Sequence, residues 1–272
     1  MIGQINLRTK IDDLIDNDLF PRFTILVGQF GSGKKLMCGH IARTLKRPYA
    51  FIGVGVDDVK EMINEAYKNY APMVYVIADA DKMSAAAKNA LLKVTEEPPQ
   101  NASFILTLTD LNSTLGTIRS RGQVLYMDPY SRDEILEIHK QMYPGAVDET
   151  EVIGELCETP GEVMMLHDAP ALEMWDYVEK VIYNIDTVSG SNAFKISQKI
   201  KMKDTDTGYD LRLFWKSFMC ICVDLLREDP MRYSEGVKIT SKYLQELRIT
   251  GINRQSTFDM WLLDIRNAWR LK

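Results

Sequence analysis

The residues with the clearest chemical potential form a glycine-rich segment at positions 28–35, Gly-Gln-Phe-Gly-Ser-Gly-Lys-Lys. The segment follows a predicted strand and begins a predicted helix, and its spacing fits the G-x₄-G-K pattern of loops that bind nucleotide phosphates. In such a loop the backbone N–H groups surround phosphate oxygens, and Lys34 reaches the terminal phosphates. We therefore expect ATP or ADP to bind here, through Gly28, Gly31, Ser32, Gly33, Lys34 and Lys35. A glycine-rich turn without a ligand is the alternative, and the agreement of the glycines, the lysine and the flanking elements disfavours it.

The residue after Lys34 departs from the usual pattern. Loops of this kind carry Ser or Thr at that position, and its hydroxyl ligates Mg²⁺. Here the position holds Lys35. The sequence therefore predicts nucleotide binding, leaves Mg²⁺ binding open and argues against magnesium-assisted hydrolysis.

A second acidic segment follows the predicted strand at positions 73–77. Hydrolytic phosphate-loop proteins usually end such a strand with acids that hold Mg²⁺ and polarise the attacking water. The position of the magnesium-holding acid is taken by Ala78, and Asp79 stands where a catalytic glutamate is usual. Because Asp is one methylene shorter than Glu, its reach to the water is reduced. The alternative is that Asp79 and Asp81 simply end a buried strand.

These segments must be positioned by an α/β fold. Short β-rich runs at 23–27, 50–52, 73–77, 103–108 and 124–126 alternate with helical patterns near 35–46, 57–70 and 84–95. This alternation predicts a parallel sheet flanked by helices. From Ser131 onward the remaining segments show helical spacing, interrupted by Pro and Gly. We place one boundary after residue 128 and a second, softer one after residue 169.

Composition narrows the function classes. The 272 residues include 46% hydrophobic and 26% charged residues, which is ordinary for a folded protein, and no apolar run is long enough to span a membrane. A net charge of −5 argues against a protein that coats nucleic acid by bulk attraction. The four cysteines lack the paired spacing of a zinc site, so we expect no zinc and assign no residue as a metal ligand. The start of the sequence lacks the pattern of a signal peptide, which predicts a cytoplasmic protein.

Further motifs carry a family resemblance. The segment at 83–93, followed by Glu-Glu-Pro-Pro at 96–99, resembles the helix after the second acidic motif in clamp-loader subunits of the AAA+ class. Ile-Arg-Ser-Arg-Gly at 118–122 is similar to the Ser-Arg-Cys motif of that family, and Ile-Gly-Gln at 2–4 resembles its N-terminal Val-Gly-Gln. The match runs over about residues 1–169. It is greatest to the delta-prime subunits of bacterial DNA polymerase III.

The resemblance implies three parts and several roles. An α/β AAA+ phosphate-loop core would occupy residues 1–128, a small helical lid 129–169, and an all-α collar 170–272 that joins the subunits. Thr109 would stand at the first sensor position, and Arg121 would act in trans on the ATP of a neighbouring subunit. The implied partners are other clamp-loader subunits, a sliding clamp and primer-template DNA.

Departures from the family pattern indicate a site without ATP turnover. The four-cysteine zinc module of bacterial relatives is absent, and Met164 stands where the second sensor would place an arginine. Together with Lys35 and Ala78, this predicts a stator-like subunit, a rigid chain that serves its neighbours without hydrolysing ATP. Two alternatives stay open: an active motor subunit of a minimal clamp loader, or a scaffold subunit that binds no nucleotide.

Overall fold

The computed structural model describes residues 2–146, 148–167, 170–201, 209–247 and 252–270. The contacts divide the chain into two compact units, the first comprising Met1–Met142 and Cys157–Met164, the second Tyr143–Leu156 and Met165–Lys272. The segment 129–169, predicted as a lid, is shared between the two units. The boundary expected after residue 169 falls beside residues 168–169, which lie outside the described residues. The division into core, lid and collar therefore stays a prediction.

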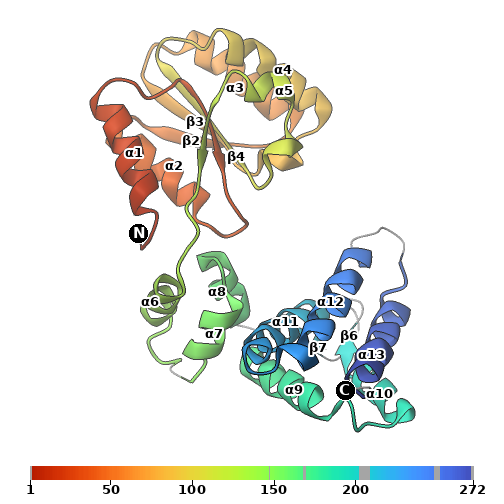
Figure 1. The fold of residues 1–272 in the computed structure, drawn as a ribbon. Helices are drawn as coiled ribbons and strands as arrows, with labels where there is room; N and C mark the ends of the chain where they lie inside the picture. Colours follow the sequence, from red (N-terminus) through yellow and green to blue (C-terminus); the bar gives the residue numbers. More distant parts are fainter. Residues whose placement is uncertain (1, 147, 168–169, 202–208, 248–251, 271–272) are drawn as a thin grey trace. The chain divides into compact units, whose positions relative to one another are not determined.

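A five-stranded parallel sheet forms the centre of the first unit (Figure 1). Its strands are β1 (Phe23–Val27), β2 (Tyr49–Ile52), β3 (Met73–Ile77), β4 (Ala102–Leu108) and β5 (Gln123–Tyr126). The order is β2-β3-β4-β1-β5, so the carboxyl end of β4 lies between those of β1 and β3. The five predicted strands are confirmed, with ends shifted by at most one residue. This order brings the loop after β1 to the same sheet edge as the acidic segment after β3.

Helices cover both faces of the sheet, so β1 and β4 are buried along their whole length. The helices α1 (Ile5–Asp16) and α2 (Lys34–Thr44) pack on one face, and α3 (Val56–Lys68), α4 (Ala85–Glu96) and α5 (Gly116–Arg119) pack on the other. Two short 3₁₀ turns, η1 (Ala80–Lys82) and η2 (Leu111–Ser113), follow β3 and β4. The two faces alternate along β1, where Ile25 contacts the α3–α4 side and Leu26 the α1–α2 side. The first unit also contains α6 (Arg132–Met142) and the start of α8 (Pro160–His167).

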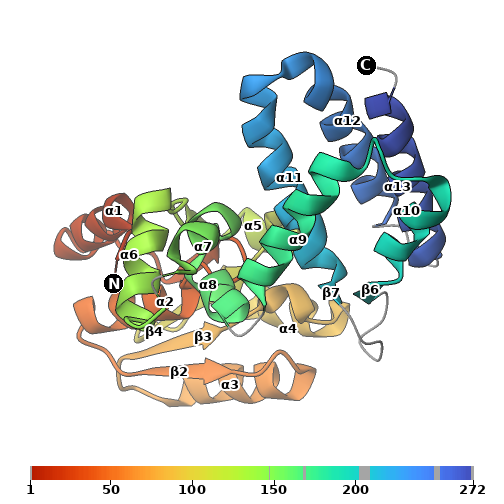
Figure 2. The same ribbon diagram turned by 90° about the horizontal axis from the view of Figure 1, so that it is seen from below.

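The second unit is built from helices (Figure 2). They are α7 (Thr150–Leu156), α9 (Ala171–Asn184), α10 (Gly190–Ser197), α11 (Leu211–Glu228), α12 (Pro230–Glu246) and α13 (Arg254–Arg270). Its core is aromatic: Phe214, Phe218 and Trp261 are fully buried, and the Trp261 indole donates a hydrogen bond to Thr240 Oγ1 at 3.0 Å. Three of the four tryptophans are buried in this unit, as their helical spacing predicts.

One feature departs from a purely helical second half. The two-residue strands β6 (Ile200–Lys201) and β7 (Tyr209–Asp210) pair in parallel. They are too short to show the alternation from which a strand is predicted. Among the described residues, no helix has both the length and the hydropathy needed to cross a membrane.

Candidate functional site

The predicted phosphate loop joins β1 to α2, at the carboxyl edge of the sheet. Its first residue is fixed to the neighbouring strand, because the Gly28 N–H donates to the Leu108 carbonyl at 3.0 Å. Gly31 and Gly33 have φ angles of 74° and 87°. Residues with a Cβ rarely adopt this left-handed region, so the turn of the loop depends on these two glycines.

Lys34 points into the loop. Its ammonium donates to the carbonyl oxygens of Gly28 and Gln29, at 2.7 and 2.8 Å. Burial lowers the pKa of Lys34 below its usual value, while the negative charges of Asp79 and Asp81 act in the opposite direction. The ammonium is therefore a largely desolvated positive charge held by two backbone carbonyls of the loop. A lysine in this position is typical of loops that bind phosphate.

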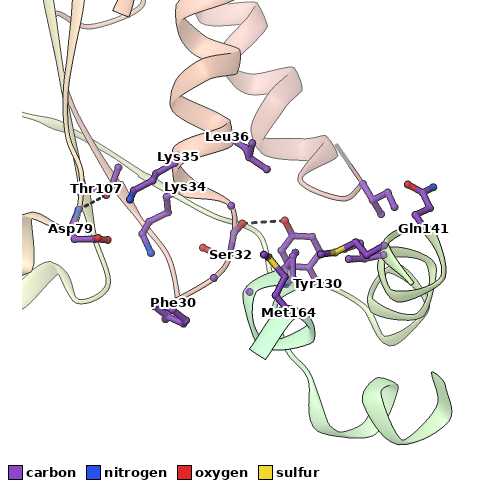
Figure 3. Close-up of a pocket in the computed structure, with 17 residues that line it drawn as sticks. Phe30, Ser32, Lys34, Lys35, Leu36, Asp79, Thr107, Tyr130, Gln141 and Met164 are labelled. Atoms are coloured by element: carbon purple, nitrogen blue, oxygen red, sulfur yellow. Dashed lines mark hydrogen bonds between the residues drawn. The ribbon is translucent and has the colours of Figure 1, made fainter. Parts of the chain in front are cut away.

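A cavity of about 570 Å³ lies beside the loop (Figure 3). Ligand pockets of this size are common in proteins. One side consists of residues 30–36, and the opposite side comprises Tyr130, Ile138, Gln141, Met142, Pro160, Gly161 and Met164. Asp79 and Thr107 reach the cavity from the ends of β3 and β4, and Ile2 completes the wall. Five of the six predicted nucleotide-binding residues line the cavity. The sixth is Gly28, whose carbonyl accepts a hydrogen bond from the Lys34 ammonium.

The start of α8 contacts the tip of the loop within the first unit. The Gly161 N–H donates to the Gly31 carbonyl at 3.0 Å, and Gln29 Nε2 donates to Glu158 at 3.2 Å. A Cβ on Gly161 would lie 2.4 Å from Gly31 Cα, so the approach requires glycine. The Tyr130 hydroxyl adds a bond to the Ser32 carbonyl at 3.1 Å. Sequence reasoning missed Tyr130 and this role of Gly161, because nothing in their spacing connects them to the loop.

The acidic segment after β3 divides into two environments. Asp79 lines the cavity with a φ of 55°, and its N–H donates to Thr107 Oγ1 at 2.9 Å. Asp81 instead accepts hydrogen bonds from Thr109 N, Asp110 N and Ser113 Oγ. Burial alone would raise the pKa of Asp81, but the hydrogen bonds from Ser113, Thr109 and Asp110 outweigh it and lower the pKa. Asp81 therefore anchors the turn after β4, while Asp79 is the carboxylate beside the loop.

The remaining predicted site residues lie in different places. Met164, at the expected second-sensor position, lines the cavity. Thr109 is not among the lining residues; Thr107, two residues earlier on β4, is. Arg121 also lies outside the cavity wall, where its guanidinium donates to Glu96 Oε1 at 2.7 Å and to the Thr117 carbonyl at 2.9 Å. Sequence reasoning did not find Thr107, because it lies within a buried strand and nothing in its local pattern indicates that it lines a cavity.

A protein-family model matches a segment in the first half of the chain. Residues 15–131 match the model of the family described as DNA polymerase III, delta subunit. The clamp-loader resemblance is thereby confirmed. The delta-prime subunit of Haemophilus influenzae is 31% identical over 115 residues, 41% of this chain and 35% of that protein. The Escherichia coli delta-prime subunit is 38% identical over 79 residues, 28% of this chain and 24% of its own length.

Other relatives support the same fold. The gamma/tau subunit of DNA polymerase III from Mycobacterium tuberculosis is 42% identical over 72 residues, 25% of this chain and 12% of that protein. The match thus spans about an eighth of the length of the Mycobacterium gamma/tau subunits. A gamma-subunit-related protein of DNA polymerase III from Thermotoga maritima has a similar structure, with a TM-score of 0.54 and 17% identity over 98% of this chain and all of that one. The structure of the Thermotoga maritima RuvB branch-migration motor is also similar, with a TM-score of 0.51 and 16% sequence identity. That match covers 99% of this chain and 87% of the RuvB chain. The fold is that of an AAA+ protein with a helical C-terminal region.

Proposed function

We propose that this chain is a stator-like clamp-loader subunit that holds a nucleotide without hydrolysing it and supplies Arg121 to a neighbouring ATPase subunit. The main support for this proposal is that Lys34 and Arg121 lie in different places. Lys34 lies inside the loop of the chain's own site, whereas Arg121 lies outside that cavity. An arginine so placed is available to the nucleotide of another chain.

The absence of turnover is supported by three residues at the cavity or beside it. Lys35 replaces the magnesium-binding hydroxyl, Ala78 replaces the magnesium-binding acid, and Met164 replaces an arginine. Lys35 and Met164 both line the cavity. A thioether and an ammonium cannot ligate Mg²⁺, and a thioether cannot neutralise phosphate charge, so the groups that accelerate phosphoryl transfer are missing.

The surroundings of Arg121 suit a group that leaves its place on assembly. Its partner Glu96 is 53% exposed and Arg121 itself 32% exposed. Ion pairs this accessible contribute about 0.2–1 kcal/mol, so exchange for a phosphate group costs little. The planar guanidinium presents paired donors that match phosphate oxygens in shape and charge.

The partners follow from the same assignment. Other clamp-loader subunits would join through the helices after residue 170, with the sliding clamp and primer-template DNA bound by the cytoplasmic assembly. Support comes from large apolar side chains exposed on the second unit, among them Met231, Met260 and Tyr183. Exposed side chains of this kind are common at protein interfaces.

The test is the steady-state ATPase activity of the reconstituted complex with clamp and primed DNA. Arginine fingers contribute about 10³–10⁵ in rate at one site, so Arg121→Ala should remove most of the turnover of the site it serves. The matched control is Arg119→Ala, because Arg119 is a neighbouring arginine whose guanidinium donates to Asn112 Oδ1 at 3.0 Å. An unchanged rate for Arg121→Ala with a large drop for Arg119→Ala would move the role to Arg119. No change in either variant would refute the action in trans.

A further inference from the structure

The nucleotide cavity lacks the protein ligands that Mg²⁺ uses in phosphate-loop sites. Such sites hold the ion through a Ser or Thr hydroxyl after the loop lysine and an acid at the end of the neighbouring strand, with phosphate oxygens and water completing the shell. These positions hold Lys35 and Ala78. One is a cation and the other has no donor atom.

The oxygens nearby do not replace these ligands. Asp81 is not among the lining residues, and its carboxylate accepts hydrogen bonds from Thr109, Asp110 and Ser113. Thr107 Oγ1 is fully buried and already accepts the Asp79 N–H. Asp79 remains, and its carboxylate lies 3.7 Å from the Lys82 ammonium. A single carboxylate that is already paired with a lysine ammonium does not fit a resident Mg²⁺.

Lys35 occupies the sequence position of the missing magnesium-binding hydroxyl. It lines the cavity, and Figure 3 shows its side chain extending toward the side where Asp79 and Thr107 lie. Lys34 and Lys35 are the first two residues of α2, whose first turn contains no acidic residue. Positive charge at a helix N-terminus is unfavourable without an anion, so this arrangement is suited to bound phosphate.

We propose that the cavity binds a nucleoside di- or triphosphate free of divalent metal, with the Lys35 ammonium supplying the positive charge that Mg²⁺ supplies in hydrolytic sites. This inference rests on the proposed nucleotide binding and specifies that the bound nucleotide carries no divalent metal. A magnesium ion on the terminal phosphates would lie close to Lys35 and be repelled by it. Free nucleotide is therefore the better ligand, and the bound phosphates have no metal to assist their hydrolysis.

The experiment is an equilibrium titration of the full chain with fluorescent ADP and ATP, once with excess Mg²⁺ and once with a chelator. For the wild type, chelation should leave the affinity unchanged or raise it. Lys35→Ala should weaken binding in the chelator by about tenfold to a hundredfold, the loss expected for one charge-assisted contact. The variant should fold, because Lys35 is exposed on the surface of α2. Lys60→Ala is the matched control, since Lys60 is exposed on α3, outside the cavity wall, and its loss should not change the affinity.

Three results would overturn the inference, each in a different way. A fall in affinity of tenfold or more on chelation would show that Mg²⁺ is part of the ligand, and nucleotide binding itself would stand. Equal affinity of Lys35→Ala and wild type in the chelator would remove Lys35 from the site. Absence of binding in both conditions would refute the proposed nucleotide binding as well.

Discussion

The contact between the loop tip and α8 offers a test of the site's architecture through the substitution Gly161→Ala. The added Cβ would lie 2.4 Å from Gly31 Cα and 3.4 Å from the Gly31 carbonyl carbon and oxygen. Because these are backbone atoms, no side-chain rotation relieves the overlap. The loop and the helix must move apart, which also stretches the 3.0 Å hydrogen bond from Gly161 N–H to the Gly31 carbonyl.

The expected cost follows from this geometry. Insertion of a methyl group into a closely packed site typically destabilises a protein by about 1–3 kcal/mol. The hydrogen bond contributes about 0.5–1.5 kcal/mol, but its loss is part of the same displacement and is not added. We therefore expect Gly161→Ala to lower the free energy of unfolding of the first unit by about 1–3 kcal/mol.

The assay is urea unfolding followed by far-UV circular dichroism, with Gly39→Ala as the matched control. Gly39 lies within α2, and a Cβ there would meet the Tyr49 side chain at ordinary contact distances, 3.5 Å to its hydroxyl and 3.8 Å to its Cζ. Alanine in a helix is favoured over glycine by about 0.5–1 kcal/mol, so Gly39→Ala should stabilise the protein. The same substitution should thus lower the free energy of unfolding at Gly161 and raise it at Gly39. If Gly161→Ala unfolds at the wild-type urea concentration, the close approach of the two glycines is wrong.

Two further predictions concern the loop lysine and the cysteines. Lys34→Ala should lower the affinity for ADP and ATP by about tenfold or more, because it removes a charge-assisted contact to phosphate. The wild-type chain alone should hydrolyse ATP no faster than buffer. Magnesium-dependent ATP hydrolysis that Lys34→Ala abolishes would instead place the chain among the motor subunits. Burial raises the pKa of Cys38 and Cys222 to about 12, so both thiols remain protonated at pH 8. Both should react slowly, because the thiolate is the reactive form of cysteine. Iodoacetamide should therefore modify the partly exposed Cys220 first in the native protein, as peptide mass spectrometry can measure. Labelling of Cys38 as fast as that of Cys220 would contradict its burial.

Much of the first unit was predictable from local pattern. The inner strands β1, β3 and β4 are buried on both faces and therefore appear in the sequence as short, largely apolar runs, such as the one at 23–27. Gly31 and Gly33 were recognisable because their spacing before Lys34 serves a backbone turn that glycine adopts most easily. Such features depend on neighbours a few residues away, and those neighbours are visible in the sequence.

Long-range contacts decided the rest of the site. Gly161 reaches the loop tip across 130 positions, and Tyr130 reaches Ser32 across 98, so no local spacing connects either pair. Likewise, Asp79 and Asp81 look equivalent in the sequence. Their surroundings separate them, because the turn after β4 supplies hydrogen-bond donors to Asp81 alone, while Asp79 faces the cavity.

The sequence by itself thus determined which residue types carry charge and which backbone positions need glycine, since both follow from local chemistry. It also determined the absence of a hydroxyl at Lys35 and of an acid at Ala78. Only the tertiary structure decided which groups share the cavity and that Arg121 lies outside its wall, paired with Glu96. The reason is physical: parallel strand order and helix packing join segments that are distant along the chain, and the resulting burial and hydrogen bonds give identical side chains different roles.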